Sequence, residues 1–323
     1  GLSVFNTTDS LEYVYRGTSS GWQKNVTYTR ANDIGLLNGA DQRLMIEPTT
    51  NVLAGRALTV EAGSTVAGGT SAFQTLSQGN RSWQQMTSTT SGDIYAIDFG
   101  NNIYKRTGGT GNFISLSQTI RQWLGIAAAP NGDVFASVLG GGSIYKQTGG
   151  SGNFVTLGIT GRDYRGMAVA PNGDIYVCVN AGDIFKSTDN GVTFTALSQT
   201  SRTWYGMAAA SNGDIYAVGD NQLYKQTGGI GNFISQGVTS RAYQFITVSG
   251  GDIYATTYPS GNIFKQTGGS GDFVSLNQTS RDWAGIVAAP NGDIYANVFG
   301  GDIYIQTGGT INLGSKLIPF NYY

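Results

Sequence analysis

The stretch that decides the fold lies near the C-terminus, "RDWAGIVAAPNGDIYANVFGGDIYIQTGG", from Arg281 to Gly309. It holds three short apolar segments, which begin at Trp283, Ile294 and Ile303. Alternating side chains within "GDIYANV" are typical of a strand with two different faces. The Asn-Gly pair before this segment favours a two-residue hairpin with a type I′ turn. The stretch therefore predicts three consecutive antiparallel strands.

This stretch is one copy of a repeat. Its opening Arg-x-aromatic word occurs six times, and each copy is followed by a "GDIY"-like word, an "IYKQTGG"-like word and, in five of them, an "NFxSL"-like word. A period of about 40 residues with four strands per unit is typical of propeller blades. The repeated arginines are Arg81, Arg121, Arg162, Arg202, Arg241 and Arg281, and their aromatic partners are Trp83, Trp123, Tyr164, Trp204, Tyr243 and Trp283.

The repeat predicts an all-β fold, a six-bladed β-propeller of four-stranded blades. The last unit breaks off after Gly309, whereas "GGTSAFQTLSQGNRSW" (Gly68 to Trp83) aligns with "GGTGNFISLSQTIRQW" (Gly108 to Trp123) and precedes any first strand. We therefore expect this N-terminal segment to supply the outer strand of the last blade, which would remove an open sheet edge. The predicted domains are a β-rich attachment or oligomerisation segment, 1–66, and the propeller, 67–323.

Composition excludes several classes of protein. The chain has 49 glycines, 12% charged residues and a net charge of −1, so there is no basic field to attract nucleic acid. It has no histidine, a single cysteine and no apolar run of 18 residues that would predict insertion into a membrane. We expect no disulfide, no metal site and no cofactor.

One turn carries a family motif. "KSTDNGVTF" (Lys186 to Phe194) resembles the Asp-box of sialidase-like propellers, and the matching residues are Ser187, Asp189, Gly191, Thr193 and Phe194. The resemblance implies a structural turn between the third and fourth strands, away from the active face. The "G-x-I-Y-K-x-T" and "W-x-G-hydrophobic-A" words, over residues 68–309, also resemble the tectonin repeats of six-bladed lectins.

The N-terminal segment resembles a different class of protein. "SVFNTTDSLEYVYRGTSSGW" (Ser3 to Trp22) is similar to a hairpin of bacteriophage tail-fibre and other virion appendage proteins, and "GRALTVEAGSTVAGGT" (Gly55 to Thr70) is similar to stretches of such fibre shafts. Together the two stretches imply that residues 1–66 attach the protein to other virion proteins.

The repeated arginines and aromatics are the first candidates for a glycan site. A ring of guanidinium groups could bind anionic sugars, and exposed aromatics could stack on sugar rings. The alternative is that the arginines hold the ring together and the aromatics are buried between blades, which an identical residue in every blade favours. The loops between second and third strands differ between units, and Tyr258 and Asn262 in "TYPSGN" are further candidate glycan contacts.

Catalysis is not expected from the residue types in the propeller. Glycoside hydrolysis needs paired carboxylates or a Tyr–Glu pair with a raised-pKa acid. All three glutamates, Glu12, Glu47 and Glu61, lie in the N-terminal segment, and the aspartates of the propeller are mostly repeated turn residues. We therefore predict no catalytic residues and no enzyme.

These observations predict a virion appendage, such as a tail fibre or capsid spike, whose propeller binds host cell-surface glycans. Its partners would be other virion proteins, through residues 1–66, and a host polysaccharide. It would be a homo-oligomer, with a trimer as one form, on the surface of an extracellular particle. The alternatives are a secreted tectonin-like lectin and a structural virion domain without a ligand. Residues 1–66 distinguish the virion protein from the secreted lectin.

Overall fold

The structure is a computed structural model that describes residues 72–307 and, as backbone only, five short strands outside that range. These strands are β1 (Ser3–Asn6), β2 (Leu11–Tyr15), β3 (Trp22–Asn25), β4 (Thr65–Val66) and β29 (Ile311–Asn312). The chain divides into two compact units, Gly1–Gly69 with Asn312–Tyr323, and Thr70–Ile311. In the first unit, β1, β2 and β3 form an antiparallel sheet. The stretch Gly55–Thr70 lies outside the described residues except at β4.

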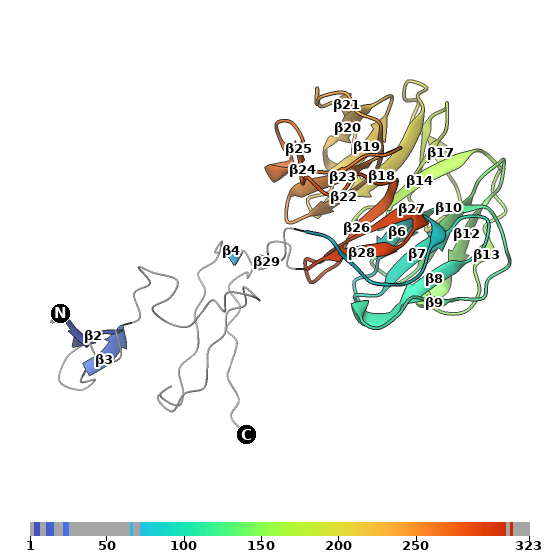
Figure 1. Cartoon of the computed structure of the whole chain (residues 1–323). Coiled ribbons are helices and arrows are strands. Elements are labelled where there is room, and N and C mark those ends of the chain that lie inside the picture. The colour runs from blue at the N-terminus through green and yellow to red at the C-terminus, as the bar shows by residue number, and fades with distance from the viewer. Residues whose placement is uncertain are drawn as a thin grey trace. The chain divides into compact units, whose positions relative to one another are not determined.

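The second unit is built from repeated antiparallel strands (Figure 1). The first strands are β6 (Arg81–Ser88), β10 (Trp123–Ala128), β14 (Tyr164–Val169), β18 (Trp204–Ala209), β22 (Tyr243–Ser249) and β26 (Trp283–Ala288). The second strands are β7 (Ile94–Asp98), β11 (Val134–Val138), β15 (Ile175–Val179), β19 (Ile215–Gly219), β23 (Asp252–Thr257) and β27 (Ile294–Gly301).

The third and fourth strands complete the repeat. The third strands are β8 (Ile103–Arg106), β12 (Ile144–Gln147), β16 (Ile184–Ser187), β20 (Gln222–Gln226), β24 (Ile263–Gln266) and β28 (Ile303–Gln306). The fourth strands are β9 (Ile114–Ser115), β13 (Val155–Thr156), β17 (Thr195–Ala196), β21 (Ile234–Ser235), β25 (Val274–Ser275) and β5 (Gln74–Thr75). After β8, β12, β20 and β24 the chain makes a 3-10 turn: η1 (Thr107–Gly109), η2 (Thr148–Gly150), η3 (Thr227–Gly229) and η4 (Thr267–Gly269).

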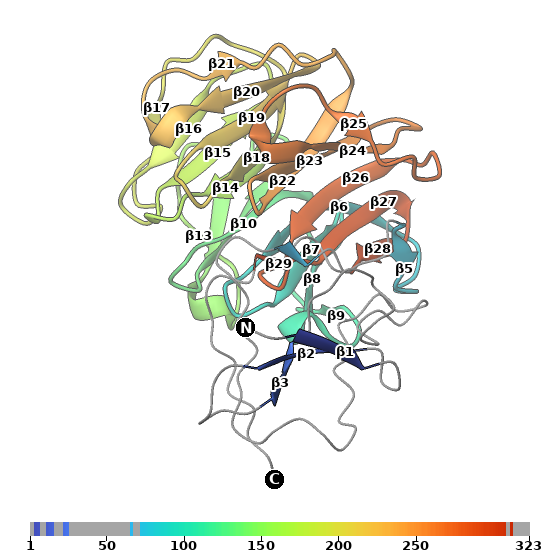
Figure 2. The same cartoon turned by 90° about the vertical axis from the view of Figure 1, so that its left-hand side faces the viewer.

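The strands form an all-β propeller, which confirms this part of the predicted fold. Four sheets, β10–β13, β14–β17, β18–β21 and β22–β25, are separate four-stranded blades. The remaining strands form one eight-stranded sheet, because β27 pairs with β6 through Phe299↔Ser82 and Gly301↔Arg81. Each first strand contacts the first strand of the next repeat, and β26 contacts β6. These strands therefore surround a central axis, with the short fourth strands toward the outside (Figures 1 and 2).

The turn between the first and second strands differs from the predicted two-residue type. In the second repeat, the Gly132 N–H donates to the Ala129 carbonyl, and only Gly132 takes a positive φ, of 88°. Asn131 has no positive φ, so a type I′ turn is ruled out; its side-chain oxygen instead accepts a hydrogen bond from the Asp133 N–H at 3.0 Å. The turn is a three-residue loop, with proline and asparagine at its centre and glycine in the left-handed region.

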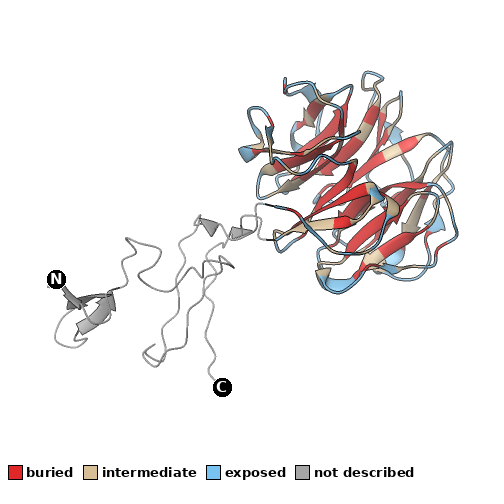
Figure 3. Ribbon diagram, in the orientation of Figure 1, coloured by how far each residue is buried: buried red, intermediate tan, exposed pale blue. Residues whose placement is uncertain are grey.

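The core lies between neighbouring sheets (Figure 3). In one such cluster Tyr95 and Ile103 of β7 and β8 pack with Trp123 and Ile126 of the following first strand, β10. The same arrangement repeats around the ring, so each first-strand aromatic closes the gap between two sheets. Burial of one large aromatic per repeat explains why the Arg-x-aromatic word recurs at a fixed period.

Candidate functional site

The repeated aromatics and arginines are part of the scaffold. The side chains of the six aromatics are at most 1% exposed, so none offers a face to a sugar. Each arginine guanidinium stacks on the aromatic ring of the third strand in its own repeat, at 4.5 to 5.1 Å from the ring centroid. Arg121, for example, lies over Tyr145 at 4.7 Å. The aromatics are thus buried between sheets, as the alternative interpretation had them, whereas the arginines stack within their own repeat.

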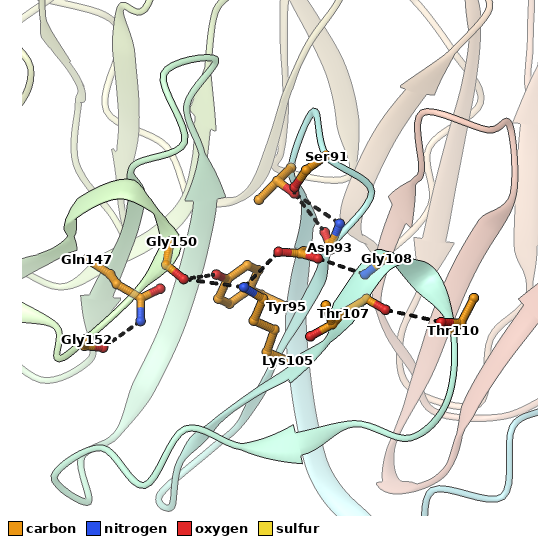
Figure 4. A network of polar contacts seen from close by, with 11 residues as sticks. Ser91, Asp93, Tyr95, Lys105, Thr107, Gly108, Thr110, Gln147, Gly150 and Gly152 are labelled. Carbon is orange, nitrogen blue, oxygen red and sulfur yellow. Dashed lines mark hydrogen bonds and ion pairs between the residues drawn. The ribbon is translucent and has the colours of Figure 1, made fainter.

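The repeated aspartates join turns within and between repeats. Lys105 lies 2.7 Å from the Asp93 carboxylate, and Asp93 also accepts the Gly108 N–H at 2.7 Å (Figure 4). Tyr95 and Lys105 both donate to the Gly150 carbonyl of the next repeat, at 3.1 and 3.3 Å. Partial burial would raise the pKa of Asp93, but the bonds from Lys105 and Gly108 outweigh it and lower the pKa below its ordinary value.

The Asp-box is a compact hydrogen-bonded turn between β16 and β17. Ser187, 1% exposed, donates to Asp189 at 2.7 Å and accepts the Gly191 N–H at 2.9 Å. Asp189 also accepts the Thr193 N–H and hydroxyl, at 2.9 and 2.6 Å. Phe194 is half-buried against the core cluster around Phe135. The geometry gives this motif a structural role, as the resemblance implies.

The two loop candidates separate in the structure. Asn262 is occupied by its own turn, because its side chain donates to the Gln278 carbonyl at 2.7 Å and accepts the Ile263 and Gln278 N–H groups. Tyr258, by contrast, lines a cavity and meets the Phe299 ring edge-on, with 6.5 Å between centroids. Only Tyr258 among the predicted site residues reaches that cavity.

The cavity has a volume of about 480 Å³ and lies where the first strands meet. A cavity of this size suits a small organic ligand. Every first strand contributes the residue that directly follows its repeated aromatic. These six residues are Gln84, Leu124, Arg165, Tyr205, Gln244 and Ala284. They have the same place in the repeat but differ in chemistry, so the scaffold presents five kinds of side chain at six equivalent positions.

The loops after the second strands form the rest of the wall. Phe99, Leu139, Asn221 and Tyr258 with Pro259 come from four of these loops, and Phe299 lies near the end of β27. Loops held on a rigid scaffold are where binding residues are usually found. These loops are a variable part of each repeat in the sequence, and most of them line the cavity.

Arg165 is the only charged residue that lines the cavity within the described part of the chain. Its guanidinium lies 3.8 Å from the Asp163 carboxylate and 5.7 Å from the centre of the Tyr205 ring. Asp163 is also held by the Asn180 side chain at 2.9 Å. The Nε of Arg165 is buried, and none of the described residues accepts a hydrogen bond from it. Arg106 and Trp123 also have buried donors without an acceptor among the described residues, but only Arg165 of the three lines the cavity, where a ligand atom could accept its hydrogen bond.

The next position along the first strands is glycine in four repeats and a larger residue in two. At each of these four glycines a Cβ would collide with the next strand; for example, a Cβ on Gly125 would lie 2.0 Å from the Arg165 carbonyl oxygen. The other two strands carry Gln85 and Phe245. Gln85 is buried, donates to the Met167 carbonyl at 3.2 Å and accepts the Ile126 N–H at 3.0 Å. Phe245 lines the cavity, whereas Gln85 lines a separate 220 Å³ cavity further along the same strands.

Other reactive groups are not assembled into a site. Within residues 72–307 no three His, Cys, Asp or Glu side chains are grouped closely enough to hold a metal ion. Burial raises the pKa of the Cys178 thiol to about 12, so this cysteine is a poor nucleophile. No helix in the described ranges has the length and apolar character needed to cross a membrane.

Comparisons with known proteins identify the fold. The sequence matches no family model and no curated protein. Its structure is similar to a gluconolactonase from Xanthomonas campestris, with a TM-score of 0.60, 10% identity, and coverage of 78% of this chain and 98% of the other. It is also similar to a PQQ-bound aldose sugar dehydrogenase from Streptomyces coelicolor, with a TM-score of 0.58, 15% identity, and coverage of 75% and 99%. A streptogramin B lyase matches with a TM-score of 0.54, 14% identity, and coverage of 73% and 96%.

These comparisons correct the predicted relationship and function. At such low identities the likeness shows the β-propeller fold alone, yet the similar propellers named here are enzymes and not phage tail fibres or lectins. The predicted non-catalytic virion appendage with a glycan-binding head, together with its kinship to tail fibres and tectonin-like lectins, is therefore wrong. The physical reason is that the words behind the lectin resemblance are blade scaffold, which a propeller of any function needs.

The prediction that the protein is not an enzyme is corrected on the same ground. It rested on the absence of glutamate and histidine from the propeller. An arginine beside tyrosine hydroxyls can also bind and stabilise negative charge in a cavity. The position after each repeated aromatic was not among the predicted site residues, because it lies inside a strand whose other positions repeat. The signal available in the sequence was a position next to a repeated aromatic that takes five residue types in six copies.

Proposed function

We propose that this propeller is an enzyme that acts on a small oxygen-containing organic molecule bound in the 480 Å³ cavity between the first strands. The observation that carries the proposal is Arg165, the single charged lining residue, with a buried Nε that lacks an acceptor among the described residues. Arginine binds carboxylate and carbonyl oxygens through a planar fork of N–H groups.

The chemistry that the cavity can supply is stabilisation of negative charge on oxygen. A cation held in a partly desolvated site stabilises an oxyanion more strongly than it would in water. Tyr205 and Tyr258 add phenol groups, and Gln84, Gln244 and Asn221 add amide groups to the same wall. The names of the similar gluconolactonase and aldose sugar dehydrogenase support small oxygen-rich substrates as the first class to test.

The test is turnover of a panel of sugar lactones, simple esters and sugar acids by the full chain, with and without Arg165→Met. Methionine keeps much of the side-chain volume and removes the charge. We expect turnover with the wild-type protein and a loss of about 100-fold or more in the variant, as for removal of an oxyanion donor. Arg121→Met is the matched control, because Arg121 stacks on Tyr145 outside the cavity. No turnover and no thermal stabilisation by any compound would overturn the proposal.

We also propose that the eight-stranded sheet comprises two blades, which makes six in all. Its halves are β26-β27-β28-β5 and β6-β7-β8-β9, and they have the strand order of the four separate blades. The pairing of β28 with β5 through Tyr304↔Thr75 and Ile305↔Gln74 supports closure of the ring by the N-terminal strand. The 1–66 boundary, oligomerisation through that segment and an extracellular location stay predictions.

A further inference from the structure

The wall of the cavity has two chemically different sides. Around the ring the lining residues follow the order of the first strands, Gln84, Leu124, Arg165, Tyr205, Gln244 and Ala284. Arg165 and Tyr205 are neighbours, and Asn221 joins them from the loop after β19. The strands on the far side of the ring, β26 and β6, bring Ala284 and Gln84, with Phe299 near the end of β27 and Phe99 from the loop after β7. One side thus carries the charge, and the far side is mainly aromatic, with Gln84 as its amide group.

We propose that the substrate is a monocarboxylate with an aromatic or alicyclic body. Its carboxylate is bound by Arg165, and its body lies against Phe99, Phe299 and Tyr258. This inference rests on the proposed function, because it assigns the substrate class of the same cavity. The inference adds the charge of the ligand and its orientation in the cavity to the proposed function.

The polar side of the cavity favours a ligand with a single negative charge. Arg165 is 3.8 Å from Asp163, so the two side chains together are close to neutral before a ligand arrives. A carboxylate can take the free Nε and share the guanidinium with Asp163. A dianion such as a phosphate monoester would need a second cation, and none lines the cavity in the described part of the chain.

The far side selects a flat apolar body. Tyr258 and Phe299 meet edge to face, which leaves ring surface available for a third ring. Ala284 is the smallest of the six ring residues and leaves room beside Phe299. Phe245 also lines the cavity and adds apolar surface to its wall. The hydroxyl groups of a sugar acid would find no hydrogen-bond partners on these apolar surfaces. The ring of an aromatic acid would instead bury the same surfaces away from water.

The direct test compares ligands that differ in one feature. Binding of 3-phenylpropanoate to the full chain is measured by calorimetry, next to its uncharged amide, acetate and phenyl phosphate. We expect the acid to bind at least about 10-fold more tightly than each of the three, because the acid alone combines a single charge with a ring.

Two variants assign the two ends of the ligand. Arg165→Met should abolish the preference for acid over amide, and Arg165→Lys should restore part of it. Ala284→Leu should weaken acid and amide alike by about 10-fold or more, because leucine fills the space of the ring. Arg121→Met, outside the cavity, should change neither affinity.

The outcomes separate this inference from the function on which it rests. Equal affinity for acid and amide, or no effect of Ala284→Leu, overturns the assigned substrate class. If lactones are turned over but no aromatic acid binds, the inference fails and the proposed enzyme stands. If no compound of either panel binds or reacts, both fail.

Discussion

At the scale of the residue, Asp189 shows how one side chain can order a whole turn. Its carboxylate accepts three hydrogen bonds, from the Thr193 hydroxyl, the Thr193 N–H and the Ser187 hydroxyl. These bonds favour the charged form and hold the pKa of Asp189 at about 2, with the Thr193 hydroxyl as the largest cause. A hydrogen bond to an exposed group can therefore set a pKa without burial.

This pKa predicts a loss of stability in acid. A carboxyl with a lower pKa in the folded state than in the unfolded state stabilises the fold above its unfolded pKa, and this contribution is lost as pH falls through the folded value. For Asp189 the window runs from about 4 down to about 2. We expect the free energy of unfolding to fall over this range and Asp189→Asn to flatten the fall. Urea unfolding at pH 7, 4 and 2.5 measures it, and equal slopes for both proteins would contradict the prediction.

At the scale of the element, the first strands approach each other as closely as backbones can. An ideal Cβ on Gly125 would lie 2.0 Å from the Arg165 carbonyl oxygen and 2.6 Å from the Ser137 hydroxyl. A Cβ on Gly166 would lie 2.4 Å from the Tyr205 carbonyl oxygen. The glycines are therefore needed because neighbouring first strands lie so close together. The neighbouring strand in each case carries the cavity residue of the next repeat.

This packing predicts the effect of one methyl group. Gly125→Ala should push β14 away from β10 and destabilise the protein by about 1–3 kcal/mol, as other overpacked cores are destabilised. Because Arg165 is on β14, the same change should also weaken ligand binding or turnover. Wild-type melting temperature and activity in Gly125→Ala would show that the strands can yield freely.

The strands of the propeller could be predicted from the sequence, whereas most residues of the cavity could not. Four strands per repeat follow from the spacing of apolar words, since each word buries its alternate side chains in the same way in every copy. Two features escaped prediction. The type of turn at Asn131 depends on the number of residues that connect β10 to β11. The preference of an Asn-Gly pair for one turn type does not specify this number. The cavity forms because the residue after each buried aromatic, such as Trp123 or Tyr164, faces the central axis. Only the arrangement of the six first strands around that axis determines this direction.

At the scale of the whole molecule, a short strand from one end of the unit completes the sheet at the other. β5 pairs with the outer edge of β28, and Phe73 beside it packs on Trp283 with 6.0 Å between ring centroids. Gln78 extends the link, because its N–H donates to Asp302 at 2.7 Å. The stability of the propeller therefore depends on a contact between residues more than 200 positions apart in the chain.

Removal of this strand should destabilise the ring. A chain that begins at residue 79 lacks Phe73 and β5 and exposes the edge of β28. Loss of a buried phenylalanine costs about 3–5 kcal/mol, which corresponds to a fall of about 6 °C or more in melting temperature. We also expect concentration-dependent association, because an open strand edge can pair with another chain.

A chain that begins at residue 70 is the matched control, since it keeps β5 and lacks the residues before it. Scanning calorimetry and light scattering on both shortened chains make the comparison. Equal melting temperatures would show that the pairing of β5 adds nothing to the fold.

The six cavity positions have a consequence for how such a protein can change. Each follows a buried aromatic whose packing is the same in every repeat, so a new side chain there leaves the blade interfaces intact. Mutation can therefore revise the ligand one position at a time, while duplication and drift of the repeats leave the architecture unaltered. A lineage with this arrangement can explore new chemistry with little risk of misfolding, and comparison of those six positions alone would sort its members by what they bind.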